Sequence, residues 1–163
     1  MKTTDKFLIG IVVTIILIVI AAIAVTLARP EKTYLADDAP ENVVHNYLLA
    51  LQKKEYARAY GYLSPDLPGY PGYLEAFKKD IASYSWQFRN DQRASFTIEG
   101  VEKYSEQAIV KVLKTQFYDG DIFSSGQYIS TFEMEVVLID GQWKIEGGDD
   151  YFIWCWLSNN RCK

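Results

Sequence analysis

The stretch from Gln127 to Ile145 reads QYISTFEMEVVLIDGQWKI, and its pattern is the clearest structural signal in the chain. Between residues 127 and 139, apolar side chains alternate with polar ones such as Glu133 and Glu135. This alternation is typical of a β-strand that has one face in the core and the other in water. The side chains that we expect to face the core are Tyr128, Phe132, Met134, Val136 and Leu138.

The turn that follows this strand is Asp140-Gly141, a dipeptide that is strongly preferred in two-residue hairpin turns. Residues 142–145 should therefore return alongside as the next strand, with Trp143 and Ile145 pointing inward.

Upstream of the hairpin, the periodicity of the apolar residues changes from strand-like to helical. Asp37 or Asp38 is the expected N-cap of the first helix, with Pro40 and Glu41 in its first turn. Helices first and an antiparallel meander afterwards predict an α+β fold in which the helices cover one face of the sheet. The expected helices lie within residues 43–51, 56–63 and 73–83, and the expected strands within 94–101 and 107–118.

A long apolar run, Phe7–Ala28, precedes this domain and contains no charged residue. As a helix it would be about 33 Å long, against a hydrocarbon core of about 30 Å, so it can span a bilayer as one piece. The competing interpretation is a cleaved signal peptide with Ala22-Ile23-Ala24 as its cleavage site, but the run exceeds the usual length of about 7–15 residues. We expect a cytoplasmic tail (1–6), a transmembrane helix (7–28), a linker (29–39) and an outer domain (40–163).

The orientation in the membrane does not follow from the flanking charges. Lys2 and Lys6 precede the apolar run, and Arg29 and Lys32 follow it, so the Lys/Arg count is equal on both sides. Two cysteines in the outer part, at positions 155 and 162, favour an oxidising compartment. We therefore expect a single-pass protein of the cell membrane with a cytoplasmic N-terminus and the domain outside.

The charge of the chain excludes some partners. There are 17 Lys and Arg against 21 Asp and Glu, a net charge of −4. Lys2, Lys6 and Asp5 precede the apolar run, which leaves a net charge of −5 for the remainder. This is the wrong sign for binding nucleic acid.

Cys155 and Cys162 are expected to form a disulfide, which would contribute about 2–3 kcal/mol in the chain-entropy model. These thiols and the single histidine, His45, are a poor ligand set for a metal ion, and no nucleotide-binding motif is present. We therefore expect no metal and no cofactor.

Several segments resemble the nuclear transport factor 2-like (cystatin-like cone) superfamily over about residues 40–157. The segments that carry the resemblance are Pro40–Val44, Tyr47–Leu51, Glu55–Tyr60, Leu63–Pro65 and the hairpin Asp140–Ile145. The resemblance implies a cone of about three helices packed on a curved antiparallel sheet. The superfamily includes isomerases, dehydratases, binding modules and membrane-anchored domains, so the fold alone does not give the function.

Catalytic members of this superfamily often place an Asp–His or a Tyr–Asp pair in the cone. Here His45 lies on the flank of the first apolar helix stripe, which predicts a surface or boundary position. The Asp residues of the strand region fall in turns, so no catalytic residue is assigned. Large rings either fill the core, which we favour, or line a cavity; they are Tyr47, Tyr60, Phe77, Trp86, Phe117, Tyr128 and Phe132.

The segment Tyr151–Leu157 is expected to form a final strand, and it is apolar on both alternating faces. One face is then free to contact a partner, through Phe152, Trp154 and Trp156. Two hypotheses result. The first is a non-catalytic accessory subunit of a membrane complex, bound to other subunits; the second is a membrane-tethered small-molecule-binding or isomerase-like cone.

Overall fold

The computed structural model describes residues 3–27, 32–67, 70–83, 94–118, 126–148 and 151. The chain divides into two units, Met1–Thr33 and Tyr34–Lys163. The first unit contains helix α1, Thr3–Leu27, whose segment Phe7–Val25 has a mean hydropathy of 3.3. By length and composition this segment can cross a membrane, a criterion that N-terminal signal sequences also meet.

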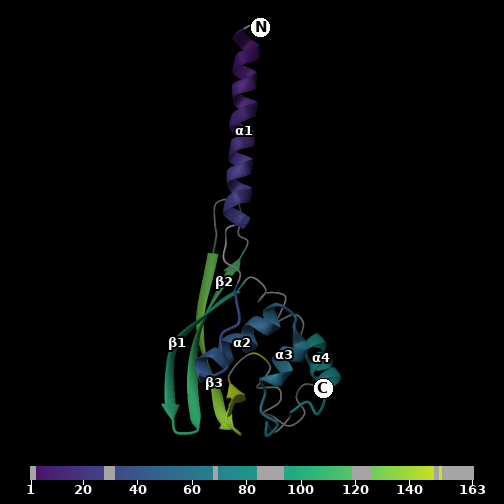
Figure 1. Ribbon diagram of the computed structural model, residues 1–163, viewed down its shortest axis with the longest axis vertical. Coiled ribbons are helices and arrows are strands. Elements are labelled where there is room, and N and C mark those ends of the chain that lie inside the picture. The colour runs from purple at the N-terminus through teal and green to yellow at the C-terminus, as the bar shows by residue number, and fades with distance from the viewer. Residues whose placement is uncertain are drawn as a thin grey trace. The chain divides into compact units, whose positions relative to one another are not determined.

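The second unit confirms the α+β fold class. Its helices precede its strands along the chain, as the periodicity predicts (Figure 1). The elements are α2 (Pro40–Gln52), α3 (Tyr56–Gly61), α4 (Leu74–Ser83), β1 (Ala94–Tyr104), β2 (Gln107–Tyr118), β3 (Gly126–Ile139) and β4 (Gln142–Gly148).

The four described strands form one antiparallel sheet in the order β1-β2-β3-β4. The register shifts at two places, between Ile98 and Gly100 in β1 and between Glu135 and Val136 in β3. Such bulges increase the local twist, so they contribute to the curvature of the sheet.

The hairpin between β3 and β4 has the predicted geometry. Asp140 and Gly141 both have positive φ, 49° and 78°, as a type I′ turn requires. Trp143 and Ile145 are buried, with exposed fractions of 6% and 0%. The inward direction predicted for both side chains is therefore confirmed.

The two faces of β3 also follow the predicted alternation. Phe132, Met134 and Val136 are buried, whereas Glu133 and Glu135 are exposed. The prediction fails at the start of the strand, where the side chain of Tyr128 is 56% exposed. The first residues of the strand extend beyond the core. Side chains still alternate between the two faces there, but those on the inner face are no longer buried.

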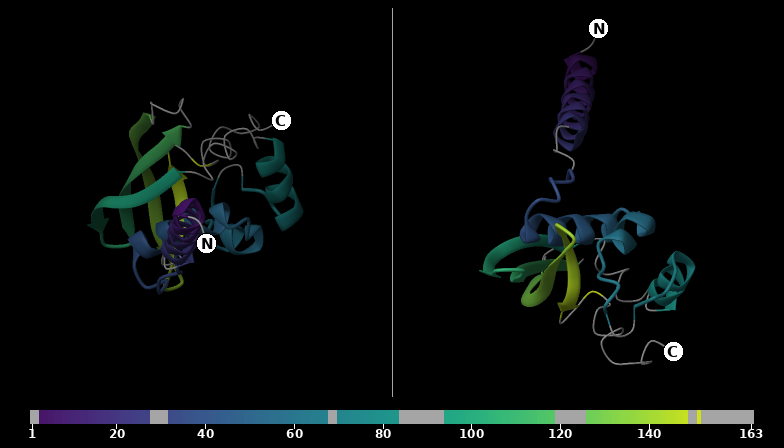
Figure 2. Two further views of the ribbon diagram at one scale, coloured as in Figure 1. Left: turned by 90° about the horizontal axis from the view of Figure 1, so that it is seen from above. Right: turned by 60° about the horizontal axis from the view of Figure 1, so that its bottom comes forward.

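The core lies between the sheet and α2, which contacts all four strands. This helix is buried around most of its circumference, including Val44, Tyr47, Leu48 and Leu51. We expected the helices together to cover the sheet, but α4 lies beside α3 and away from the strands (Figure 2). Since α2 supplies most of the apolar surface, one well-buried helix covers the inner face.

The start of α2 corrects the predicted N-cap. The N-cap is Ala39, which makes no side-chain capping bond, while Pro40 stands in the first turn as predicted. Asp37 and Asp38 instead accept hydrogen bonds from Asn46 and Asn42, at 2.6 and 3.1 Å. Their carboxylates are therefore engaged by asparagines of α2 rather than by its free backbone N–H groups.

Helix α3 ends at Gly61, two residues before its predicted end at Leu63. Residues 62–64 instead pair with β4: Ile145 N–H donates to Tyr62 O, and Ser64 N–H donates to Ile145 O, both at 2.8 Å. These backbone groups therefore form hydrogen bonds with the edge of β4 instead of continuing helix α3. Of the predicted last strand, Tyr151 lies in a turn, and residues 152–157 lie outside the described residues.

Candidate functional site

Four of the rings proposed as cavity lining lie in or against the core. Tyr47 and Phe77 are fully buried, and Phe132 is 6% exposed. The Tyr60 ring lies 5.3 Å from that of Tyr70 and 5.5 Å from that of Phe77, measured between centroids. Tyr60 and Phe77 therefore pack against each other, and all four rings belong to the hydrophobic core or pack against it.

The other proposed residues lie elsewhere. Phe117 and Tyr128 are 53% and 56% exposed, so neither belongs to the buried set. Trp86 lies outside the described residues, as do the predicted contact residues and the predicted disulfide; these are Phe152, Trp154, Trp156, Cys155 and Cys162. His45 is half-buried on α2, at the boundary position that its place on the helix predicts.

One basic side chain, Lys114, enters the inner face of the sheet. It is 9% exposed, and its Nζ lies 5.0 Å from the centroid of the Tyr151 ring. Tyr151 O accepts a hydrogen bond of 2.9 Å from the hydroxyl of Tyr47, whose pKa burial raises far above its usual value. The sequence patterns did not single out Lys114, although it stands in phase with the inward residues Val110 and Val112.

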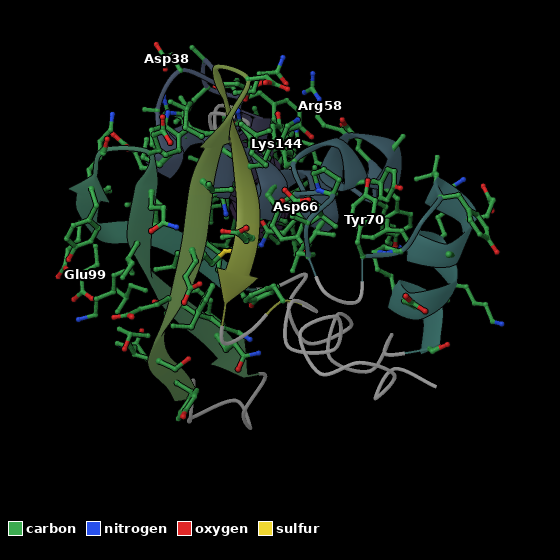
Figure 3. The ribbon with its side chains drawn as sticks, turned by 90° about the horizontal axis from the view of Figure 1, so that it is seen from below. Asp38, Arg58, Asp66, Tyr70, Glu99 and Lys144 are labelled. Carbon is green, nitrogen blue, oxygen red and sulfur yellow. The ribbon has the colours of Figure 1, made fainter. Side chains whose placement is uncertain are left out.

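An open pocket of about 470 Å³ lies beside α3 and the β3–β4 hairpin. It combines two cations, one carboxylate, a phenol and an indole; the cations are Arg58 of α3 and Lys144 of β4, both labelled in Figure 3. Its lining residues are Asp37, Ala57, Arg58, Gly61, Tyr62, Gln142, Trp143 and Lys144.

The polar groups of this pocket are held by defined contacts. Lys144 Nζ donates to Gly61 O at 2.8 Å, and the Arg58 guanidinium lies 3.8 Å from the centroid of the Tyr34 ring. Tyr62 has a pKa raised to about 12, first because of its burial and second because of the nearby charge of Asp37. Two cations therefore line the same pocket as a carboxylate whose charge acts on a neighbouring phenol.

A buried asparagine fixes the segment that leads into this pocket. Asn46 is 0% exposed; its Oδ1 accepts from Leu35 N–H at 2.9 Å, and its Nδ2 donates to Leu35 O at 2.8 Å. The same Nδ2 donates to Asp37 Oδ1 at 2.6 Å. Tyr34 adds a hydrogen bond from its hydroxyl to Glu55 Oε2 at 2.9 Å. These contacts, which we call the connector clasp, tie residues 34–37 to α2 and to the start of α3.

Among the described residues, no group of three His, Cys, Asp or Glu side chains is placed to hold a metal ion. The pocket and the connector clasp were not predictable from the sequence, since neither depends on a local motif.

Comparison with known proteins gives general similarity of fold. The sequence matches no known family model and no curated protein. A SEC-C motif containing protein from Rhodopseudomonas palustris is 10% identical, with a TM-score of 0.49, over 72% of this chain and 82% of that one. A nuclear transport factor 2-like protein of unknown function from Shewanella oneidensis is 12% identical, with a TM-score of 0.44, over 65% and 90%. A putative ketosteroid isomerase from Shewanella frigidimarina is 16% identical, with a TM-score of 0.46, over 71% and 98%.

Proposed function

We propose that this chain is a single-pass membrane protein with a nuclear transport factor 2-like outer domain. In this proposal it serves as a non-catalytic accessory subunit that binds other subunits of a membrane complex. The apolar helix α1 supports the anchor, and the order of helices and strands supports the family. The buried Trp143 after the Asp140-Gly141 turn agrees with the hairpin that suggested the family from sequence.

The observation that carries the binding role is the packing of the interior. Tyr47, Tyr60, Phe77 and Phe132, which were candidates for a cavity, contact other rings or are fully buried. Because these side chains fill the interior, we expect the domain to recognise its partners at its outer surface. The proposed contact through Phe152, Trp154 and Trp156 rests on the sequence alone, because a strand with two apolar faces has one face to offer a partner.

The test is co-purification of the native full-length protein in mild detergent. We expect partner subunits to travel with the wild type and to be lost from Trp154→Ala or Trp156→Ala, with the tryptic digestion pattern of the domain unchanged. Large rings at protein contacts often contribute more than about 1 kcal/mol each. A wild type that purifies alone would refute the subunit role, and Trp variants that unfold would place these rings in the core.

The proposed orientation has its own test, which uses sealed cells. We propose that the domain lies outside and that Cys155 and Cys162 are paired. External protease should then remove the domain from intact cells, and alkylation without reductant should label neither cysteine. Protection of the domain, or labelling of either thiol, would contradict the orientation or the pairing.

One observation favours a second function, a membrane-tethered small-molecule-binding or isomerase-like cone. Lys114 brings a basic group onto the inner face of the sheet, beside the rings of Phe96 and Tyr151. Replacement of Lys114 by Met should leave partner binding intact under the first function. A loss of turnover or of ligand binding in this variant would favour the second.

A further inference from the structure

The pocket beside α3 contains cations that the described part of the chain does not neutralise by ion pairs. The ion pairs among the described residues join Lys78 to Glu75 and Lys111 to Glu99, on other parts of the domain. Arg58 and Lys144 therefore have no described carboxylate within ion-pair distance. Lys144 donates to a neutral carbonyl, Gly61 O, which leaves most of its donors open to the pocket.

The carboxylate of the pocket is already in use. Asp37 Oδ1 accepts from the buried Asn46 at 2.6 Å, and the carboxylate lies close enough to Tyr62 for its charge to help raise the pKa of that phenol. The Arg58 guanidinium lies 3.8 Å from the centroid of the Tyr34 ring, and the charge of Glu55, which accepts a hydrogen bond from the Tyr34 hydroxyl, acts on it from beyond ion-pair distance. A guanidinium has five N–H donors, so these contacts leave donors for a ligand. The pocket thus offers positively charged donors in excess of acceptors.

The lining and the volume of the pocket indicate a small ligand that has an apolar part. The indole of Trp143, which is 6% exposed, and the methyl of Ala57 give an apolar side to a volume of about 470 Å³. This lies within the range of small-molecule sites, which is about 300–1,000 Å³. An anion held at this point also meets a local positive charge on a domain that is acidic as a whole.

We propose that this pocket binds a small organic anion through its carboxylate or phosphate group, held between Arg58 and Lys144. The apolar part of the ligand lies toward Trp143. A planar guanidinium matches both acid groups with two parallel hydrogen bonds, and the ammonium adds a point charge. The acid group comes either from a free metabolite or from a lipid headgroup. The site does not depend on the proposed subunit role.

The experiment uses the full chain in nanodiscs of phosphatidylcholine, with benzoate and phenyl phosphate as probes and neutral benzamide as the control ligand. Saturation-transfer NMR should detect millimolar binding of both anions and none of benzamide. Arg58→Gln and Lys144→Gln should each weaken binding by about tenfold or more, because each removes a charge-assisted hydrogen bond. Lys78→Gln, which makes the same change of charge on α4, should have no effect.

The results separate the proposal from its alternatives. Absence of anion binding to the wild type would overturn the proposal. An anion affinity of Lys144→Gln equal to that of the wild type would also overturn it, because this variant removes the charge but can keep a hydrogen bond to Gly61 O. Equal binding of benzamide would show an apolar site and would also overturn it. Nanodiscs that contain phosphatidylglycerol then identify the source: competition with benzoate indicates a lipid headgroup, and unchanged affinity indicates a free anion.

Discussion

Replacement of Asn46 by alanine should destabilise the domain and release the connector. The side chain is fully buried on α2, and it forms three hydrogen bonds to Leu35 and Asp37. Both hydrogens of its Nδ2 are used, one on the Leu35 carbonyl and one on the Asp37 carboxylate. Alanine keeps the helix but removes every one of these bonds.

The magnitude follows from the number and the kind of these bonds. A neutral hydrogen bond contributes about 1 kcal/mol net, and one to a charged group about 1.5–3 kcal/mol. The full sum is an upper bound, because the Leu35 side chain is 47% exposed and its backbone groups can bind water after the substitution. We therefore expect Asn46→Ala to lower the free energy of unfolding by about 2–4 kcal/mol.

The assay is urea unfolding of the full chain in mild detergent, followed by tryptophan fluorescence, together with limited chymotrypsin digestion at Tyr34. The matched control is Asn42→Ala, on the same helix, where the side chain makes one exposed hydrogen bond to Asp38 at 3.1 Å. This control should cost less than about 0.5 kcal/mol. A similar small effect of Asn46→Ala, with no faster cleavage at Tyr34, would refute the connector clasp.

Three further substitutions test other parts of the domain. Gly147→Ala would place a Cβ 2.6 Å from Glu135 Oε2, which can move away, and 3.2 Å from Glu135 Cβ, which cannot, so it should cost about 1 kcal/mol in urea unfolding. Glu135→Ala keeps the Cβ contact and should therefore leave most of this cost in place. The pKa of Tyr62 is about 12 in the folded domain and about 10 in the unfolded chain. Its contribution to the free energy of unfolding is therefore complete below pH 10 and is lost as the pH rises toward 12. Tyr62→Phe should therefore flatten the fall in stability over that interval in unfolding curves measured at each pH. Tyr47→Phe should cost about 1–2 kcal/mol by removing the donor to Tyr151 O, and a thermal unfolding midpoint equal to that of the wild type would contradict this assignment.

Sequence patterns succeeded where short-range chemistry determines the structure. The period of two in β3 placed Phe132 and Met134 in the core, because successive side chains of a strand point to opposite faces. The Asp140-Gly141 turn was predictable because few other dipeptides tolerate positive φ at both positions. These features need no knowledge of the rest of the fold.

Sequence patterns failed where two distant segments meet. Leu63 left its predicted helix because the edge of β4, through Ile145, offers backbone hydrogen bonds. Asp37 was a reasonable N-cap by residue type, yet Asn46, one turn and more along α2, binds its carboxylate instead. Lys114 could have been found from its inward phase, whereas the pocket beside α3 required the whole tertiary structure.

Asn46 links the connector to the proposed anion site, and this link is itself testable. While Asn46 holds the Asp37 carboxylate, that group is less available to the cations of the same pocket. In Asn46→Ala the released connector no longer holds the Asp37 carboxylate in place, so this carboxylate can pair with Arg58 and compete with any ligand anion. Benzoate should then bind more weakly to Asn46→Ala, and the double variant Asn46→Ala with Asp37→Asn should recover the affinity if it folds. Recovery would show that the clasp keeps the cations available, while unchanged affinity in Asn46→Ala would show that the two features are independent.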